Sequence, residues 1–508
     1  ALNPLSLVVT TSLLGTLPLQ ILVTYTNRLV FGVVRSQAIP PRKASLQENL
    51  LSYESRNYNF IKTERYVGPE NFGRAMAAAV LDRCFKMEEV AKIRSDIIAL
   101  TEANIAKWLD KRTPCQVKSV QAELKLPFAA EEQITNYKLM VKRDAKVKLD
   151  DSCLSKHPAA QNIMFHKKFI NAIYSPCFDE FKNRVLSSLN RNIVFFTEMT
   201  NAGLAEVIRR IIGDDDDLFV GEVDFSKFDK SQDLFIKEYE RSLYSEFGFD
   251  DELLDLWMEG EYRARATTLD GQLSFSVDGQ RRSGGSNTWI GNSLVTLGIL
   301  SLYYDVSKFE LLLISGDDSL IYSRAPISNF SSEICLETGF ETKFMSPSVP
   351  YFCSKFVVQT GNKTCFIPDP YKLLVKLGAP QYKLTDDELF ELFTSFKDIT
   401  QDFGDQVVLE KLKFLVEAKY GFTSGTTMPA LCAIHCVRSN YLSFERLFPF
   451  IRGWYVVDAL KLRQLRKFAN LICERVVYDN RVGYFSYFDN PFTKPDASDG
   501  QADDLATG

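Results

Sequence analysis

Residues 311–323 read LLLISGDDSLIYS, in which two short apolar runs flank Gly316-Asp317-Asp318. Glycine makes a sharp reversal of the backbone inexpensive, so this stretch predicts a β-hairpin with two adjacent carboxylates at its tip. The flanking runs are apolar enough to be buried. The carboxylates would then lie at the mouth of a core, where a charge needs an ionic partner or a metal ion. Taken alone, a Gly-Asp-Asp is most often an ordinary acidic turn.

A second acidic site follows a strand that the apolar and β-branched residues predict at 218–225. Asp224 stands near the end of this strand, and Asp229 comes five residues later. Such an Asp pair alone most often belongs to a surface loop. Beside a hairpin-tip carboxylate, however, Asp224 can share divalent ions. Two Mg²⁺ ions about 3.5–4 Å apart would hold the attacking and leaving oxygens of a phosphoryl transfer. Mg²⁺ suits this because it combines few carboxylates with water and phosphates.

Between the two acidic sites lies a glycine-rich segment that leads into an apolar helix, predicted at residues 287–306. Gly284 would let a substrate approach the backbone closely. Thr288 and Asn292 are four residues apart and therefore share one face of the helix. Asn292 can both donate and accept hydrogen bonds, so it is suited to read a ribose hydroxyl together with Asp229. Alone, an asparagine in an apolar helix is more often a satisfied core residue.

The composition, with 45% hydrophobic and 25% charged residues, is typical of a globular protein. At 508 residues the chain is too long for a single hydrophobic core, so we expect several subdomains. The net charge of -5 means that local basic patches, rather than a global field, would have to hold a nucleic acid. Ten irregularly spaced cysteines show no disulfide framework, which is typical of a reducing compartment. No apolar run of about 20 residues occurs, so we predict no transmembrane span.

The order of these motifs is more specific than any one of them. Asp-x4-Asp at 224–229, Ser-Gly-x3-Thr-x3-Asn at 283–292 and Gly-Asp-Asp at 316–318 resemble motifs A, B and C of viral RNA-dependent RNA polymerases. The run DFSKFDKSQ at 224–232 is similar to the alphavirus-like supergroup in particular. Within that supergroup the chain is most similar to the replicase polymerases of plant closteroviruses. The resemblance covers roughly residues 140–380.

The resemblance implies an α+β fold with the right-hand polymerase architecture of fingers, palm and thumb, in which helices back an antiparallel palm sheet. The order of strand, two helices and hairpin also favours such a layer over a doubly wound parallel sheet. Thr385 and Glu388 have the spacing of a helix capping box. We expect an N-terminal extension at 1–60, fingers at 61–217, a palm with interleaved fingers and motifs A to E at 218–380, a helical thumb at 381–488 and a disordered acidic tail at 489–508.

Roles for the catalytic residues also follow from the resemblance. Asp224 and Asp317 would be the main metal ligands, with Asp318 a weaker partner, and the ion would be Mg²⁺ or alternatively Mn²⁺. Lys343 stands where motif D of the family places a lysine, and it would act as the general acid for the departing pyrophosphate. Judged by residue type alone, Lys343 would be an ordinary surface lysine.

The nucleotide-binding residues are implied in the same way. Asp229 and Asn292 would select ribose over deoxyribose, and Ser283, Gly284 and Thr288 would support them. A basic segment at 141–170 resembles motif F, whose cations hold triphosphate oxygens. The cations of this segment that we assign to the nucleotide are Lys142, Arg143, Lys146 and Lys148. Residues 350–357 resemble motif E, which supports the primer strand.

Three functions remain open from the sequence. The first is an RNA-directed RNA polymerase that replicates and transcribes a positive-strand RNA virus genome by two-metal nucleotidyl transfer. The second is a catalytically silent RNA-binding or scaffold subunit, which would have no reason to keep every carboxylate. The third is a reverse transcriptase, whose hairpin would normally carry an aromatic residue at the position of Gly316 and would not need Asn292.

The polymerase interpretation carries expectations about ligands and location. Template RNA, product RNA and NTPs would be its ligands, and other viral replicase proteins with methyltransferase and helicase activity would be its partners. We expect it in the host cytoplasm, at membrane-associated replication complexes, with an indirect association with host membranes.

Overall fold

The computed structural model describes the part of the chain that spans residues 44–58, 67–124, 134–142, 159–213, 217–345, 349–361, 363–378, 384–421, 424–445 and 447. The chain divides into two compact units. The larger unit comprises Pro41–Asp369 together with Asp405–Gly421. The smaller unit includes Pro370–Gly404 and the chain that follows Gly421.

The larger unit is built around a five-stranded sheet with the strand order β3-β7-β8-β4-β9. Its strands are β3 (Ile193–Phe195), β7 (Leu311–Ser315), β8 (Asp318–Ser323), β4 (Phe219–Phe225) and β9 (Thr342–Met345). All neighbours pair antiparallel except β3 and β7, which are parallel. The palm sheet that we expected to be antiparallel therefore has one parallel pair. The long chain between β3 and β7 permits this, because parallel neighbours need a crossover connection.

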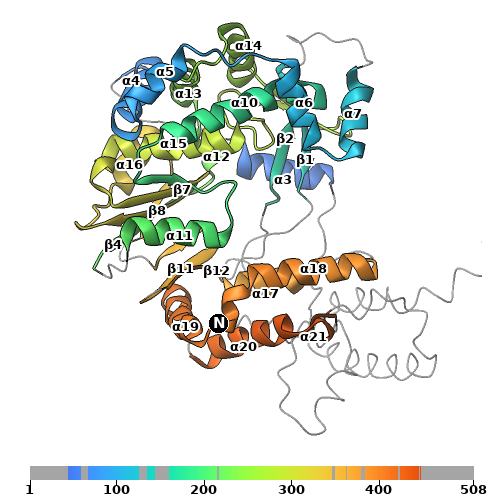
Figure 1. Ribbon diagram of the computed structural model, residues 1–508. Coiled ribbons are helices and arrows are strands. Elements are labelled where there is room, and N and C mark those ends of the chain that lie inside the picture. The colour runs from blue at the N-terminus through green and yellow to red at the C-terminus, as the bar shows by residue number, and fades with distance from the viewer. Residues whose placement is uncertain are drawn as a thin grey trace, which may run out of the picture. The chain divides into compact units, whose positions relative to one another are not determined.

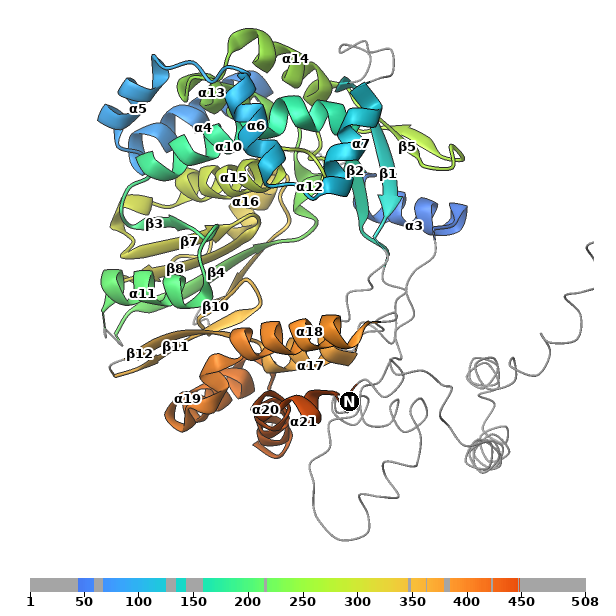
Figure 2. The same ribbon diagram turned by 45° about the vertical axis from the view of Figure 1, so that its right-hand side comes forward.

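Helices cover both faces of this sheet, which explains why residues 311–314 are continuously apolar. Successive side chains of a strand point to opposite faces. Accordingly, Leu311 and Leu313 pack in one cluster with helix α11 (Asn201–Ile212), whereas Leu312 and Ile314 belong to the main core with α15 (Thr288–Tyr303). Figures 1 and 2 show α11 on one side of the sheet and α15 with α16 (Ser331–Thr338) on the other.

Further helices surround α15 and complete the core of the larger unit. Helices α4 (Pro69–Cys84) and α13 (Leu234–Glu246) run close to α15. The other helices that the structure describes in this unit are α3 (Leu46–Arg56), α5 (Met87–Arg94), α6 (Glu102–Asp110), α7 (Pro114–Leu124), α10 (Lys168–Ser188), α12 (Phe228–Ser231), α14 (Asp251–Tyr262), the short η1 (Val306–Lys308) and α19 (Gln406–Tyr420).

Two smaller sheets belong to the same unit. One has the order β2-β1-β5-β6, in which β1 is parallel to β5, and the other is the antiparallel meander β10-β11-β12. Their strands are β1 (Asn136–Val141), β2 (Asn162–Phe165), β5 (Arg265–Thr268), β6 (Ser274–Ser276), β10 (Tyr351–Phe352), β11 (Lys355–Thr360) and β12 (Lys363–Pro368).

The smaller unit is helical wherever the structure describes it. Its elements are α17 (Pro370–Gly378), α18 (Asp386–Ile399), η2 (Gln401–Gly404), α20 (Ser424–Ser439) and α21 (Tyr441–Glu445). At the start of α18 the Glu388 N–H donates to Thr385 Oγ1 over 3.2 Å, and the Thr385 N–H donates to Glu388 Oε2 over 2.7 Å. The predicted capping box is therefore confirmed.

Other local predictions are confirmed with small shifts at their ends. The strand expected at 218–225 is β4, and the apolar helix expected at 287–306 is α15. The five predicted regions stay predictions, and the acidic tail at 489–508 lies outside the described residues. No helix in the described ranges combines the length and the apolar character needed to cross a membrane.

Candidate active site

The predicted hairpin is confirmed, and its tip is a two-residue loop. Ser315 pairs with Asp318 as the last pair of β7 and β8, which leaves Gly316 and Asp317 in the loop. Gly316 has a φ of 63°, in the left-handed region that favours glycine. The tight loop therefore requires the glycine, and it holds the two carboxylates next to each other at the end of a buried sheet.

Helix α15 holds this loop from behind through two hydroxyl groups that the motif analysis did not single out. The Gly316 N–H donates to Ser293 Oγ over 2.9 Å, and Thr296 Oγ1 donates to the Gly316 carbonyl over 2.8 Å. Both hydroxyl residues are fully buried in an otherwise apolar helix. A polar side chain at such a position is the one sequence signal that would have indicated them.

Strand β4 delivers Asp224 to the same end of the sheet. Its pairing with β8 sets Glu222 opposite Leu320, so the same register continued by two residues sets Asp224 opposite Asp318. Ser319 Oγ donates to the Val223 carbonyl over 2.9 Å and ties the hairpin to this strand. The two acidic motifs that lie about ninety residues apart in the sequence therefore meet through neighbouring strands.

Lys343 lies across the other edge of β4. In the β4–β9 pairing it is the direct partner of Asp224. Residues directly opposite each other in an antiparallel pair extend to the same face of the sheet. The exposed Lys343 side chain therefore lies on the carboxylate face, next to the strand end where Asp224 stands.

The carboxylates at this end of the sheet influence one another. Asp317 is exposed, yet neighbouring protein atoms partly desolvate its carboxylate, and this desolvation, followed by the charge of Asp318, raises the pKa of Asp317 to about 6. Asp229 and Asp224 add smaller contributions in the same direction. Burial likewise raises the pKa of Asp229. A divalent cation would relieve this accumulation of like charge.

The donor atoms fit a hard cation such as Mg²⁺ or Mn²⁺, which prefers carboxylate oxygens. Asp224 supplies such oxygens from strand β4, and Asp317 and Asp318 supply them from the tip of the β7–β8 hairpin. Within the described ranges, however, no three histidine, cysteine or acidic side chains already stand as a formed metal site.

Asp318 also interacts with Cys353 at the start of the segment expected to be motif E. Burial first, and then the Asp318 charge, raise the pKa of Cys353 to about 12, so Cys353 stays a neutral thiol that donates a hydrogen bond to the Asp318 carboxylate. Cys353 and Ser354 both have a left-handed φ, 49° and 61°, in the turn between β10 and β11. This contact distinguishes Asp318 from Asp317.

The residues assigned to ribose lie together. Asn292 Nδ2 donates to Asp229 Oδ1 over 2.9 Å. Asp229 is placed by Lys227, whose left-handed φ of 56° turns the chain from β4 into the short helix α12. The pairing of Asp229 with Asn292 that the sequence led us to expect therefore exists in the structure.

The supporting residues of the glycine-rich segment bind the protein itself. Ser283 Oγ donates to the Asn162 carbonyl over 2.8 Å, and Thr288 Oγ1 donates to the Arg282 carbonyl over 2.7 Å. A Cβ on Gly284 would lie 2.6 Å from the Met164 carbonyl oxygen. The close approach that Gly284 permits is therefore to strand β2 of the same chain, which fixes the segment before α15.

Of the basic cluster, the structure describes only Lys142, which follows β1, is half-buried and donates its backbone N–H to the Gln161 carbonyl over 2.8 Å. Arg143, Lys146 and Lys148 lie outside the described residues. Their assignment to the nucleotide stays a prediction.

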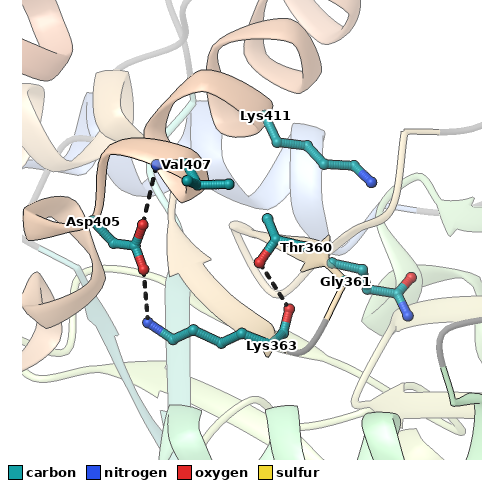
Figure 3. Close-up of a pocket in the computed structure, with 7 residues that line it drawn as sticks. Thr360, Gly361, Lys363, Asp405, Val407 and Lys411 are labelled. Atoms are coloured by element: carbon teal, nitrogen blue, oxygen red, sulfur yellow. Dashed lines mark hydrogen bonds and ion pairs between the residues drawn. The ribbon is translucent and has the colours of Figure 1, made fainter.

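A separate pocket of about 560 Å³ lies between the tip of the β11–β12 hairpin and the start of α19. Figure 3 shows the Lys363 ammonium directed at the Asp405 carboxylate, 3.5 Å away, while the other oxygen of Asp405 accepts the Val407 N–H. Its lining contains none of the residues assigned to metal, ribose or triphosphate. The pocket therefore does not belong to the carboxylate site.

The comparison with known proteins identifies the class. A family model described as RNA dependent RNA polymerase matches residues 22–447, and the chain belongs to this family. It is 61% identical over 451 residues to the replicase polyprotein 1ab of Beet yellows virus (isolate Ukraine), an alignment that covers 89% of this chain and 14% of the polyprotein. The chain thus spans a small part of the length of that relative.

Two further relatives extend the similarity. The chain is 35% identical over 419 residues to the replicase polyprotein 1ab of Grapevine leafroll-associated virus 3 (isolate United States/NY1), covering 82% of this chain and 15% of that protein. It is 29% identical over 425 residues to the methyltransferase/helicase/RNA-directed RNA polymerase of Raspberry bushy dwarf virus (isolate Malling Jewel raspberry/R15), covering 83% and 25%. The resemblance to replicase polymerases of the alphavirus-like supergroup is confirmed.

Proposed function

We propose that this chain is the polymerase part of a positive-strand RNA virus replicase and extends an RNA 3′-hydroxyl on an RNA template. One observation carries the proposal. The sheet register brings Asp224 and the Asp317-Asp318 tip to one end of the same sheet, and Asp229 is already bonded to Asn292 beside them. Nucleotidyl transfer from an NTP requires carboxylates that bind metal ions next to residues that bind the ribose of the nucleotide.

In this proposal Asp224 and Asp317 hold Mg²⁺, or Mn²⁺ in its place, and Asp318 is a weaker partner because Cys353 shares its carboxylate. The ions held by these carboxylates would supply positive charge that stabilises the negative charge on the transferred phosphate. Asp224, Asp317 and Asp318 would hold the ions at this end of the sheet, next to the bonded pair Asp229 and Asn292.

The proton balance assigns a task to Lys343. The 3′-hydroxyl gives its proton to solvent water as its oxygen forms a bond to the α-phosphorus, while the bond from that phosphorus to the bridging oxygen breaks and pyrophosphate leaves. In this proposal Lys343, which pairs with Asp224 across β9 and β4, gives its proton to the leaving oxygen. Asp229 and Asn292 meet the 2′-hydroxyl, and Lys142 with the neighbouring cations binds the triphosphate.

The same proposal assigns the regions and partners. The five-stranded sheet would be the palm, residues 61–217 would contribute fingers, and the helices at 381–488 the thumb. Template RNA, product RNA and NTPs are the ligands. The printed name of the Raspberry bushy dwarf virus relative combines methyltransferase, helicase and polymerase, which supports such activities as partners here. The proposed location is the host cytoplasm, at membrane-associated replication complexes.

Primer extension on an RNA template with Mg²⁺ tests the proposal. Asp317→Asn keeps the shape of the loop but removes the charge, so we expect at least about a thousandfold loss of extension from a lost metal ligand. RNA binding, measured by fluorescence anisotropy, should stay near that of the unchanged chain. Asp270→Asn, in the β5–β6 turn, serves as the matched control.

Three results would count against the proposal. Full extension by Asp317→Asn would exclude the metal role of Asp317. RNA binding without any extension by the unchanged chain, with Mg²⁺ and with Mn²⁺, would favour a silent RNA-binding subunit. Extension on a DNA template with dNTPs at an equal rate would favour a reverse transcriptase.

A further inference from the structure

Behind the ribose-binding pair lie five charged side chains that are nearly or wholly out of contact with solvent. This buried charge cluster consists of Lys237, Glu240, Glu261, Arg281 and Arg282, each with a side-chain exposure of 2% or less. Lys237 Nζ lies 3.1 Å from Glu240 Oε2 and 2.6 Å from Glu261 Oε2. Arg281 Nη2 donates to Glu240 Oε1 over 2.5 Å, and Arg282 Nη1 donates to Glu261 Oε2 over 2.9 Å.

The cluster is not explained by stability. Desolvation of buried ions commonly offsets their mutual attraction, so apolar residues of similar volume would serve a core at least as well. The cluster also contains three cations and only two carboxylates, which leaves an excess positive charge. A buried network of this kind is therefore expected to serve specificity rather than stability.

The cluster reaches the ribose-binding pair through Arg281. Arg281 Nε donates to Asn292 Oδ1 over 2.9 Å, and Gln232 Nε2 donates to the same oxygen over 2.9 Å. The Arg281 N–H also donates to the Asp229 carbonyl over 3.1 Å. Arg281 therefore contacts both members of the pair and links them to Glu240.

These contacts fix the orientation of the Asn292 amide. A guanidinium group can only donate and an ionised carboxylate can only accept. The amide atom facing Arg281 must therefore be the oxygen, and the atom facing Asp229 must be the nitrogen. Burial raises the pKa of Asp229, and the hydrogen bond from Asn292, followed by the charges of Arg281 and Lys237, opposes this rise. The orientation of the amide does not depend on this balance, because Arg281 can only donate and therefore faces the amide oxygen.

The fixed orientation leaves one donor and one acceptor for the substrate. Asn292 Oδ1 is already occupied by two donors, whereas Asn292 Nδ2 has a second N–H and Asp229 a second carboxylate oxygen. The 2′-hydroxyl group of a ribose can accept a hydrogen bond from Asn292 Nδ2 and donate one to the second carboxylate oxygen of Asp229. A deoxyribose leaves both without a partner, which is costly at a buried site.

We infer that Arg281 and Gln232 are positioning residues for sugar selection, which hold Asn292 with its N–H towards the 2′-hydroxyl, and that the buried charge cluster keeps Arg281 in place. The inference rests on the proposed function and deepens it. It assigns discrimination between NTP and dNTP partly to side chains that do not touch the nucleotide.

Gly291 supplies an independent observation for this arrangement. A Cβ at this position of α15 would lie 2.5 Å from Glu240 Oε1 and 2.7 Å from both terminal nitrogens of Arg281. The glycine therefore lets the Arg281–Glu240 ion pair pass against the helix one residue before Asn292. Gly291→Ala would displace the pair without changing a charge or a hydrogen-bonding group.

The test measures kcat/KM for incorporation of an NTP and of the matching dNTP by the full chain. Gln232→Leu removes one donor to Asn292 and leaves Arg281 in place, so the variant should fold. We expect the NTP-to-dNTP ratio to fall about tenfold, the worth of one buried hydrogen bond, and Gly291→Ala to lower it as well. The relative use of 3′-deoxy-NTPs, which keep the 2′-hydroxyl, should not change.

Gly298→Ala is the matched control, because it crowds the same helix without touching the cluster. Its Cβ would meet Met76 and Tyr239 instead. It should lower the melting temperature but keep the NTP-to-dNTP ratio. An unaltered ratio in Gln232→Leu would overturn the inference while leaving the polymerase proposal intact. Failure of the unchanged chain to extend a primer would overturn the proposed function itself.

Discussion

At the scale of single residues, the carboxylate of Asp317 destabilises the folded chain because it is partly desolvated and lies among other negative charges. The two-residue loop places its carboxylate beside that of Asp318 and within the influence of Asp224 and Asp229. Nothing in the described part of the chain neutralises this group of charges by forming an ion pair with Asp317. The ionised form of Asp317 therefore remains unfavourable in the folded chain unless a cation binds.

This leads to a prediction about pH and stability. Folding raises the pKa of Asp317 from 3.8 to about 6, so the folded chain holds this proton more tightly than the unfolded chain. The contribution of Asp317 to stability is complete below about pH 4 and is lost as the pH rises through 6. In metal-free buffer, Asp317→Asn should therefore melt above the unchanged chain at pH 7.5, and the difference should vanish near pH 4.

Thermal denaturation followed by circular dichroism measures the effect. Hydrogen bonds from Thr268 and Gln272 lower the pKa of Asp270, so Asp270→Asn should have the opposite sign and melt slightly lower at neutral pH. Adding Mg²⁺ should stabilise the unchanged chain more than Asp317→Asn. Equal melting temperatures of Asp317→Asn and the unchanged chain at every pH would show that the charge of Asp317 does not destabilise the folded chain.

At the scale of elements, helix α15 connects the parts of the site. It carries Asn292, holds the hairpin tip with Ser293 and Thr296, and packs its apolar side chains on β7. The hairpin tip and Asn292 are therefore positioned by one helix rather than by separate loops. We therefore expect that weakening the contact between α15 and the hairpin tip lowers kcat more than it changes KM for the NTP.

Thr296→Val tests this arrangement because valine keeps the shape and removes the hydroxyl that donates to the Gly316 carbonyl. We expect a loss of about 1–2 kcal/mol in the free energy of unfolding, since a buried acceptor loses its partner. Primer extension should show a severalfold lower kcat with little change in KM for the NTP. Ser301→Ala on the same helix, whose buried hydroxyl donates to Leu297, is the control. A kcat as low in Ser301→Ala would show that general destabilisation is responsible.

The features of this fold that could be predicted are those that depend on residues close together in the sequence. The turn at Gly316, the strand before Asp224 and the cap at Thr385 depend on residues within a few positions of each other, and all three are present. The partners of Lys237 could not be predicted in this way. Its place on α13 is consistent with an exposed charge, and only the fold brings Glu261 to it from twenty-four positions away.

The same distinction applies to the candidate site. Asp224, Asp229, Asn292 and the hairpin carboxylates were proposed as site residues because their types and order match a family. Arg281 stands beside a motif but its chemistry depends on burial, which the sequence does not indicate for a charged residue. Ser283 was assigned to the nucleotide, yet its hydroxyl donates to the Asn162 carbonyl of strand β2.

At the scale of the whole molecule, the division into two units makes a prediction about how the chain opens. Contacts within each unit are dense, and the smaller one is helical where it is described. Domains that are separately packed can open independently, because local unfolding follows the contacts within each cooperative unit. The helix caps offer a means to weaken one unit at a time.

Thr385→Ala and Thr101→Ala form a matched pair for this purpose. Thr385 caps α18 in the smaller unit and Thr101 caps α6 in the larger one, and each accepts a backbone N–H over 3.2 Å. Removal of either cap should cost about 1 kcal/mol. Hydrogen exchange should then quicken about fivefold in α18 and α20 for Thr385→Ala, with β7 and β8 unaffected, because a loss of 1 kcal/mol raises the open population by that factor. For Thr101→Ala the acceleration should instead appear around α6 and spare α18. Equal acceleration of both units by either substitution would mean that the chain opens as one cooperative body.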